Sequence, residues 1–148
     1  LEPAARARRV AADALEFFGR AVHEHHQEEE RELFPAVLAS AREGDELIHV
    51  QAIVDRLTRE HRLVESTWQR LEHGLKEVAK GRATELRGED VAALVQAYEA
   101  HARYEEQEFL PLSQTILARN GDHMAALGLS LHLRHALPEV LARFGSRI

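Results

Sequence analysis

Apolar residues recur every three or four positions along most of the chain, which predicts long amphipathic helices. No alternation of apolar and polar residues is long enough to predict a strand. We therefore expect an all-α fold with helices at about 3–42, 46–80 and 90–119, and a short C-terminal helix at about 122–136. The most regular apolar stripe lies in the second helix and consists of Val50, Val54, Leu57, Val64, Trp68, Leu71, Leu75 and Val78.

Glycines separate these stretches at Gly44, Gly81 and Gly121, and glycine commonly caps the C-terminus of a helix because it lacks a Cβ. Gly19 and Pro35 instead fall inside the first stretch, where either residue could kink or split the helix. The chain of 148 residues is long enough for one domain with a real core, and we expect a single helical bundle over 1–148.

Histidines and glutamates interrupt the apolar stripes at positions that should face the core. His61 fills the one gap in the stripe of the second helix. In the same way His25 and Glu29 lie on the stripe of the first helix, and His101 and Glu105 on that of the third. A carboxylate in such a position is costly unless a positive charge neutralises it.

The interrupted stripes belong to an internal repeat. Residues 25–35 read HHQEEERELFP and residues 101–111 read HARYEEQEFLP, so the two copies are offset by 76 positions. The shared positions are His25/His101, Glu29/Glu105, Glu30/Glu106, Glu32/Glu108 and Pro35/Pro111. The spacing His-x-x-x-Glu puts an imidazole and a carboxylate one turn apart on the same helix face. Two such motifs on facing helices, with His61 added, could hold one or two cations.

Composition narrows the chemistry further. The absence of cysteine excludes disulfides, thiolate metal sites, iron–sulfur clusters and cysteine nucleophiles, whereas histidine is abundant at 10 residues. Imidazole and carboxylate donors suit iron, manganese or zinc. The net charge of −6 argues against nucleic acid as a partner. There is no apolar run long enough to cross a membrane and no signal-peptide pattern at the first residues, so we expect no membrane partner and a cytoplasmic location.

The ordered set of motifs resembles the hemerythrin-like (HHE, cation-binding) family. The resemblance covers roughly Val10 to Leu117 and rests on the two His-x-x-x-Glu-Glu-x-Glu-apolar-apolar-Pro copies with Glu60-His61 between them. It implies an up-down four-helix bundle with a non-haem di-iron centre, in which an oxo or hydroxo group bridges the irons. Carried over by position, the implied ligands are two terminal histidines, two bridging carboxylates and a histidine from the intervening helix: His25, His101, Glu29, Glu105 and His61.

One ligand of the family pattern has no counterpart. The family places a further histidine on a helix before the first His-x-x-x-Glu helix, and the offset of the repeat puts that position upstream of residue 1. Three explanations stay open: the sequence lacks the first helix of the family, His26 substitutes for the missing ligand, or the site is degenerate and holds one metal or none. A bundle short of one helix would expose an apolar groove, which favours a homodimer.

The resemblance implies a protein that binds or reacts with a small ligand such as oxygen, peroxide or nitric oxide, in sensing, storage or detoxification. No group other than the metal is a candidate for catalysis, and the sequence leaves open whether the protein is an enzyme. The alternative is an iron-responsive regulatory or protein-interaction bundle whose metal site is degenerate or structural. Oxygen reactivity would favour the first interpretation, and an inert metal that stabilises the fold would favour the second.

Two further residues are placed near the predicted site. Tyr98 lies one turn before His101, where it could hydrogen-bond a ligand or shield it. Glu65 lies one turn after His61, and we expect it to pair with Arg62 rather than to bind metal.

Overall fold

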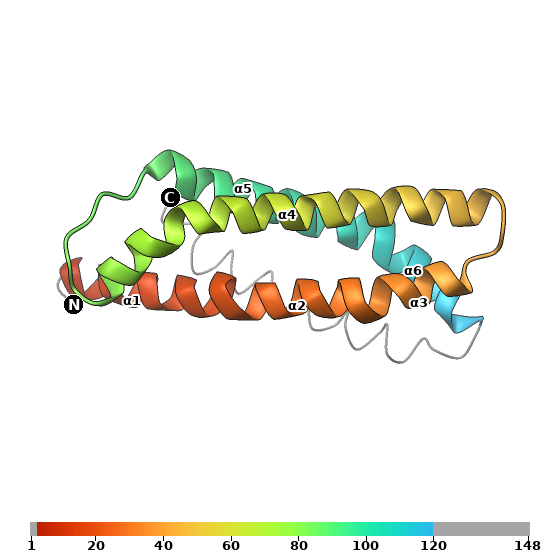
Figure 1. Cartoon of the computed structure of the whole chain (residues 1–148), viewed down its shortest axis with the longest axis horizontal. Coiled ribbons are helices and arrows are strands. Elements are labelled where there is room, and N and C mark those ends of the chain that lie inside the picture. Colours follow the sequence, from red (N-terminus) through yellow and green to blue (C-terminus); the bar gives the residue numbers. More distant parts are fainter. Residues whose placement is uncertain (1–2, 120–148) are drawn as a thin grey trace.

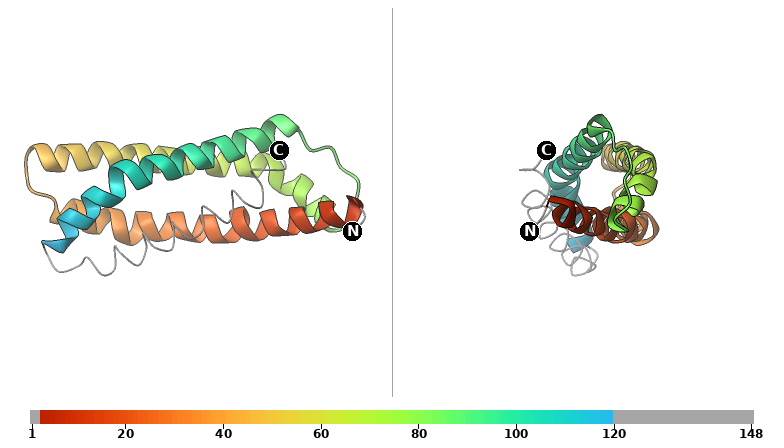
Figure 2. Two further views of the ribbon diagram at one scale, coloured as in Figure 1. Left: turned by 180° about the vertical axis from the view of Figure 1, so that it is seen from behind. Right: turned by 90° about the vertical axis from the view of Figure 1, so that its left-hand side faces the viewer.

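The computed structural model describes residues 3–119, which form three long helical rods packed side by side as a bundle (Figures 1 and 2). Consecutive rods run in opposite directions, and no strand occurs within the described part of the chain. The all-α bundle expected from the sequence is thus confirmed. In chain order the elements are α1 (Pro3–Glu16), η1 (Phe17–Val22), α2 (His23–Glu28), η2 (Glu29–Leu33), α3 (Phe34–Ser40), α4 (Asp45–Ala79), α5 (Gly88–Tyr104), η3 (Glu105–Phe109) and α6 (Leu110–Ala118).

The rods span 3–40, 45–79 and 88–118, so their ends lie within two residues of the expected ones. The helix expected at 122–136 falls outside the described residues. Gly44 and Gly81 adopt φ values of +101° and +78°, a region that other residues rarely enter. Gly44 precedes α4, and the Gly81 N–H closes the end of α4 by donating to the Val78 carbonyl at 2.9 Å.

Short π-helical segments, written η, interrupt the first and third rods. Two of them end immediately before the Phe34-Pro35 and Leu110-Pro111 pairs of the repeat. Proline has no N–H to donate, and a wider turn accommodates its ring. In both copies the residue before proline donates to the carbonyl five positions back, from Phe34 to Glu29 and from Leu110 to Glu105.

The wider turns shift the buried face by one residue. A regular helical period continued from Leu33 and Phe109 predicts Ala36 and Leu112 at the core, but both are only half-buried. The extra residue in each π turn instead buries both apolar residues before each proline, namely Leu33 and Phe34 in the first rod and Phe109 and Leu110 in the third. The third segment, η1, contains Gly19, the other position expected to disturb the first helix.

The apolar core consists of two clusters. One contains Ala11, Ala14, Phe18, Val22, Val64, Trp68, Leu71, Leu75, Leu94 and Tyr98. The other contains Leu33, Phe34, Val37, Val50, Ile53, Val54, Leu57, Phe109, Leu110, Ile116 and Leu117. Along the first and third rods, the histidines and glutamates of the repeat fall between the residues of the two clusters, and His61 does so along α4. The bundle therefore holds a polar layer between two apolar ones.

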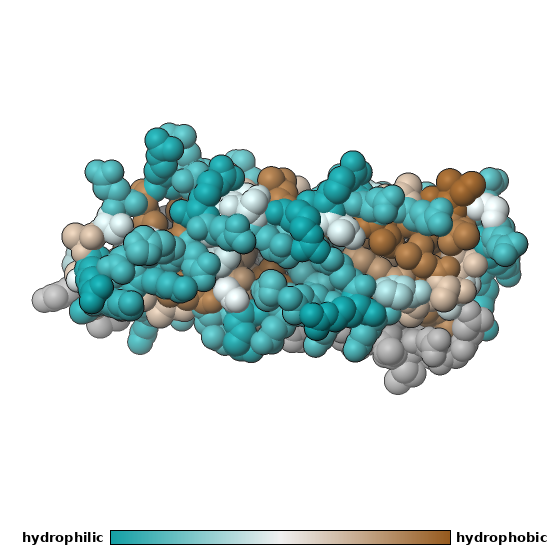
Figure 3. Space-filling model, in the orientation of Figure 1, coloured by the Kyte–Doolittle hydropathy of each residue, from teal (hydrophilic) through white to brown (hydrophobic). Residues whose placement is uncertain are grey.

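An apolar groove of about 560 Å³ lies between α1, α4 and α5, with Val10, Leu71 and Leu94 in its walls. Elsewhere the face in Figure 3 is mostly hydrophilic, with apolar side chains gathered near the α3–α4 connection. Ile48 in the first turns of α4 is 64% exposed. Within residues 3–119, no helix is both long and apolar enough to span a membrane.

We expect Leu57→Ala to lower the free energy of unfolding by about 2–5 kcal/mol, because the side chain is fully buried beside the polar layer. The matched control is Leu63→Ala on the same helix, where the side chain is 53% exposed and the loss should stay within about 0.5 kcal/mol. Urea denaturation of the two variants measures the difference. Equal losses of stability in the two variants would contradict the assignment of Leu57 to the core.

Candidate metal centre

All six residues singled out by the sequence lie inside the bundle. His25, His26, Glu29, His61, His101 and Glu105 are each between 0 and 6% exposed. The first three come from α2 and the start of η2, His61 from the middle of α4, and the last two from the junction of α5 and η3. The three rods thus each contribute to one polar layer.

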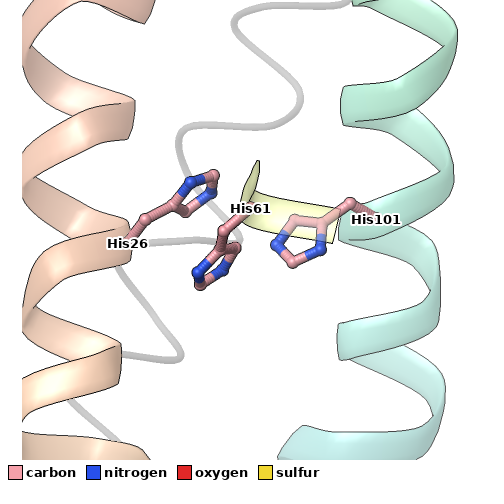
Figure 4. A group of neighbouring side chains, drawn as sticks. All are labelled: His26, His61 and His101. Carbon is pink, nitrogen blue, oxygen red and sulfur yellow. The ribbon is translucent and has the colours of Figure 1, made fainter. Parts of the chain in front are cut away.

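Three of the histidines form a compact cluster. The imidazoles of His26, His61 and His101 approach one another from three different helices (Figure 4). One nitrogen from each ring lies within 4.8 Å of the others, so the three could share an ion. The rings of His26 and His61 are stacked, with centroids 3.7 Å apart and planes 8° from parallel. His26, which the sequence offered as a substitute ligand, therefore points into the layer.

Each His-x-x-x-Glu motif places its two side chains together, as one helical turn requires. His25 Nε2 lies 3.6 Å from Glu29 Oε1, and His101 Nε2 lies 3.4 Å from Glu105 Oε2. Glu29 Oε1 also lies 3.9 Å from His61 Nε2, across the interface between the first rod and α4. These separations exceed the usual hydrogen-bond range of about 2.7–3.2 Å, so the imidazoles and carboxylates lie close together without short hydrogen bonds between these atoms.

Several of these polar atoms are buried without a hydrogen-bond partner in the described structure. They are His26 Nδ1, His61 Nε2, His101 Nε2, and both carboxylate oxygens of Glu29 and Glu105. Buried polar atoms are nearly always paired, and an unpaired one costs about 1–3 kcal/mol. Such a concentration of unpartnered nitrogen and oxygen atoms is the arrangement expected of metal ligands.

The electrostatics of the layer point the same way. Burial, and then the neighbouring negative charge of Glu105, raise the pKa of Glu29 well above its ordinary value. Burial and the adjacent histidines hold the pKa of His26 well below its ordinary value, and burial lowers the pKa of His61 to about 2. These imidazoles are therefore neutral, which is the form that binds metal. Two carboxyl groups close together in such surroundings need a cation to be charged together.

The second nitrogens of two histidines are held by carboxylates from the preceding rod. His61 Nδ1 donates to Glu30 Oε2 at 2.8 Å, and His101 Nδ1 donates to Glu60 Oε1 at 2.9 Å. A carboxylate can only accept, so each Nδ1 carries a proton, and the neutral His61 therefore keeps the lone pair on its Nε2. Carboxylates that orient ligand histidines in this way are a regular feature of metal sites.

An arginine in turn holds each of these carboxylates. Glu30 pairs with Arg62, and Glu60 accepts from Arg56 Nε at 3.1 Å. Burial alone would raise the pKa of Glu60, but the hydrogen bonds from His101 and Arg56 lower it overall. The expectations drawn from the sequence include no role of this kind for Glu30 and Glu60. The available signal was their position, because each directly adjoins a candidate ligand along the chain.

The remaining residues near the layer have clear places. Tyr98 is buried and packs edge-on against Phe17 and Phe18, with centroids 5.7 and 5.6 Å away. Burial and the charges of Glu105 and Glu29 raise the pKa of Tyr98, so its phenol stays neutral beside the layer. Glu65 pairs with Arg62 at 2.6 Å, as the sequence indicated.

Comparison with known proteins agrees with these features. An uncharacterized protein of Haemophilus influenzae is 28% identical over 116 residues, which are 76% of this chain and 64% of that protein. The chain thus spans less than two thirds of the length of this curated relative. No solved structure is a significant match. The model of the hemerythrin HHE cation-binding domain matches residues 1–113, and the chain therefore belongs to this family.

Proposed function

We propose that the protein binds a non-haem di-iron centre and uses it to bind or react with a small ligand such as oxygen, peroxide or nitric oxide. The residues that would hold the irons are His25, His26, Glu29, His61, His101 and Glu105. The observation that carries the proposal is the set of buried, unpartnered nitrogen and oxygen atoms contributed by three helices to one layer. When bound, iron would supply a redox-active centre with room for an exogenous ligand.

The donor set supports iron over softer or harder ions. Histidine nitrogens with carboxylate oxygens, and no thiolate, suit iron, manganese and zinc, whereas calcium and magnesium prefer all-oxygen sites. Carboxylates and histidines that project inward from facing helices are also the usual way in which helical bundles build di-metal sites. Two buried carboxylates close together match a centre of two metal cations, whose positive charge compensates both.

The chain itself controls access of water to the layer. Apolar side chains lie on both sides of it, including Phe34, whose ring stacks on His61 with centroids 5.8 Å apart, and Phe109. Tyr98 and Phe18 close the opposite side. Surroundings of this kind exclude bulk water and favour small ligands of low polarity.

The first test is the metal content of the purified protein by elemental analysis, with visible spectra recorded before and after exposure to air. We expect about two irons per chain and an absorption change on oxidation, as for carboxylate and histidine di-iron sites in helical bundles. Protein that contains no metal, and takes up none when ferrous iron is added, would overturn the proposal.

Glu29→Gln gives a sharper test, because its two expected effects have opposite signs. In metal-free protein the amide removes a buried carboxyl group from beside Glu105, so the melting temperature should rise by about 3 °C, which corresponds to about 1 kcal/mol. With ferrous iron at 100 times its Kd, wild-type protein should gain about 2.7 kcal/mol, and the variant should lose most of that gain. A purely structural carboxylate would give a lower melting temperature and an unchanged response to iron.

We further expect Glu30→Gln and Glu60→Gln to weaken iron binding by about 10–100-fold, since each removes the charged acceptor that orients a ligand histidine. Competition with a chelator of known affinity measures the change. Glu32→Gln, an exposed position in the same run of glutamates as Glu30, is the matched control and should leave affinity unchanged. Equal affinities in all three variants would mean that Glu30 and Glu60 do not position ligands.

A further inference from the structure

A second hollow at the surface reaches one residue of the polar layer, His26. It has a volume of about 210 Å³ and lies between the first rod, at η1 and α2, and the middle of α4. Its walls include Gly19, Val64 and Trp68, its rim includes Glu65 and Gln69, and His26 forms part of its lining. We call this hollow the His26 port.

His26 connects the port to the candidate metal centre. Its side chain is only 2% exposed and its Nδ1 has no hydrogen-bond partner, yet it lines a hollow whose rim residue Gln69 is exposed. The His26 ring also stacks on the ring of His61, with centroids 3.7 Å apart. His26 thus belongs both to the lining of the port and to the cluster that it forms with His61 and His101.

Given the proposed function, on which this inference rests, we propose that the His26 port is the binding and entry site through which a small uncharged ligand reaches the metal. The size of the port fits this class of ligand. A volume of about 210 Å³ accommodates several molecules the size of water, each of which occupies about 30 Å³ in the liquid. Pockets for larger organic ligands usually measure about 300–1,000 Å³.

The charges around the port also favour an uncharged ligand. Both acidic side chains at the rim are paired with cations, Glu65 with Arg62 at 2.6 Å and Glu72 with Lys76 at 3.0 Å. The buried side chains of Phe18, Val22, Val64 and Trp68 form apolar walls, and the polar side chains of His23, His26 and Gln69 line the rest of the hollow. Because its acidic side chains are compensated, the port offers an ion no strong attraction, and its apolar walls accommodate a neutral diatomic molecule.

Gly19 keeps the port open. A Cβ built at this position would lie 3.5 Å from Cζ2 of Trp68, which is ordinary van der Waals contact. Alanine therefore fits without closing the hollow, whereas we expect the longer side chain of leucine to extend along Trp68 into it. Both substitutions replace glycine within a helix and gain helix propensity, so neither is expected to unfold the bundle.

The test compares Gly19→Leu with Gly19→Ala in iron-loaded protein, using nitric oxide as the probe and stopped-flow absorption as the measurement. We expect the leucine variant to slow both association and dissociation about tenfold, equivalent to about 1.4 kcal/mol in each barrier, with Kd nearly unchanged. The alanine variant should match wild type. Gln69→Trp, an exposed position on the other wall, provides a second closure from α4.

Iron content, measured first, separates the two proposals. If all variants carry wild-type iron and both closures bind nitric oxide at the wild-type rate, the port is not the route and the proposed function still stands. If alanine slows binding as much as leucine does, the effect comes from the helix and not from occlusion, and the inference is overturned. If wild-type protein takes up no iron, both proposals fail together.

Discussion

The structure depends on one electrostatic constraint: Glu29 and Glu105 lie close together in an interior that cannot leave both charged without a compensating cation. Their burial is nearly complete, and the charge of Glu105 contributes to the raised pKa of Glu29. Burial lowers the pKa of His26 and His61, so these two imidazoles are neutral and cannot supply that positive charge. A metal ion would neutralise the carboxylates and use the lone pairs of these imidazoles. The apolar clusters on either side strengthen the constraint by keeping water out.

The helices reach this layer with the required side chains because the repeat encodes a backbone feature as well as ligands. In each copy a π turn begins at the motif glutamate and ends two residues before the proline. The turn inserts one residue, so that two adjacent apolar residues before each proline are buried instead of one. Within the described residues, the same sequence element therefore determines both the candidate ligand pair and the burial of the apolar residues that follow it. This local coupling explains why two segments 76 positions apart have the same conformation.

Much of the fold and the inner site could be predicted from the sequence, because periodicity encodes both. The gap filled by His61 and the paired His-x-x-x-Glu motifs lie on stripes whose burial follows from helical geometry alone. The π turns could not be predicted in the same way, since a regular period of 3.6 residues has no place for an extra residue. The contacts of Glu30 and Glu60 with histidines could not be predicted either, because the partners are on other helices and lie 31 and 41 positions away in the chain. Periodicity indicates which face a residue occupies, but not which side chain it meets across the interface.

Glu30 and Glu60 create an asymmetry among the candidate ligand histidines. Glu30 of the first rod orients His61 of α4, and Glu60 of α4 orients His101 of α5, so each rod fixes a histidine on the next one. The paired arginines hold both acceptors in place, and Arg56 in addition lies 3.6 Å above the ring of Tyr104. His26 receives no such support, because its Nδ1 is unpartnered and its ring is held by stacking on His61. Of the three clustered imidazoles, the one without a carboxylate partner is therefore the one that lines the hollow. Under the proposed entry route, this adjustable imidazole lies where a small molecule would arrive, and the two carboxylate-held imidazoles maintain the geometry of the site.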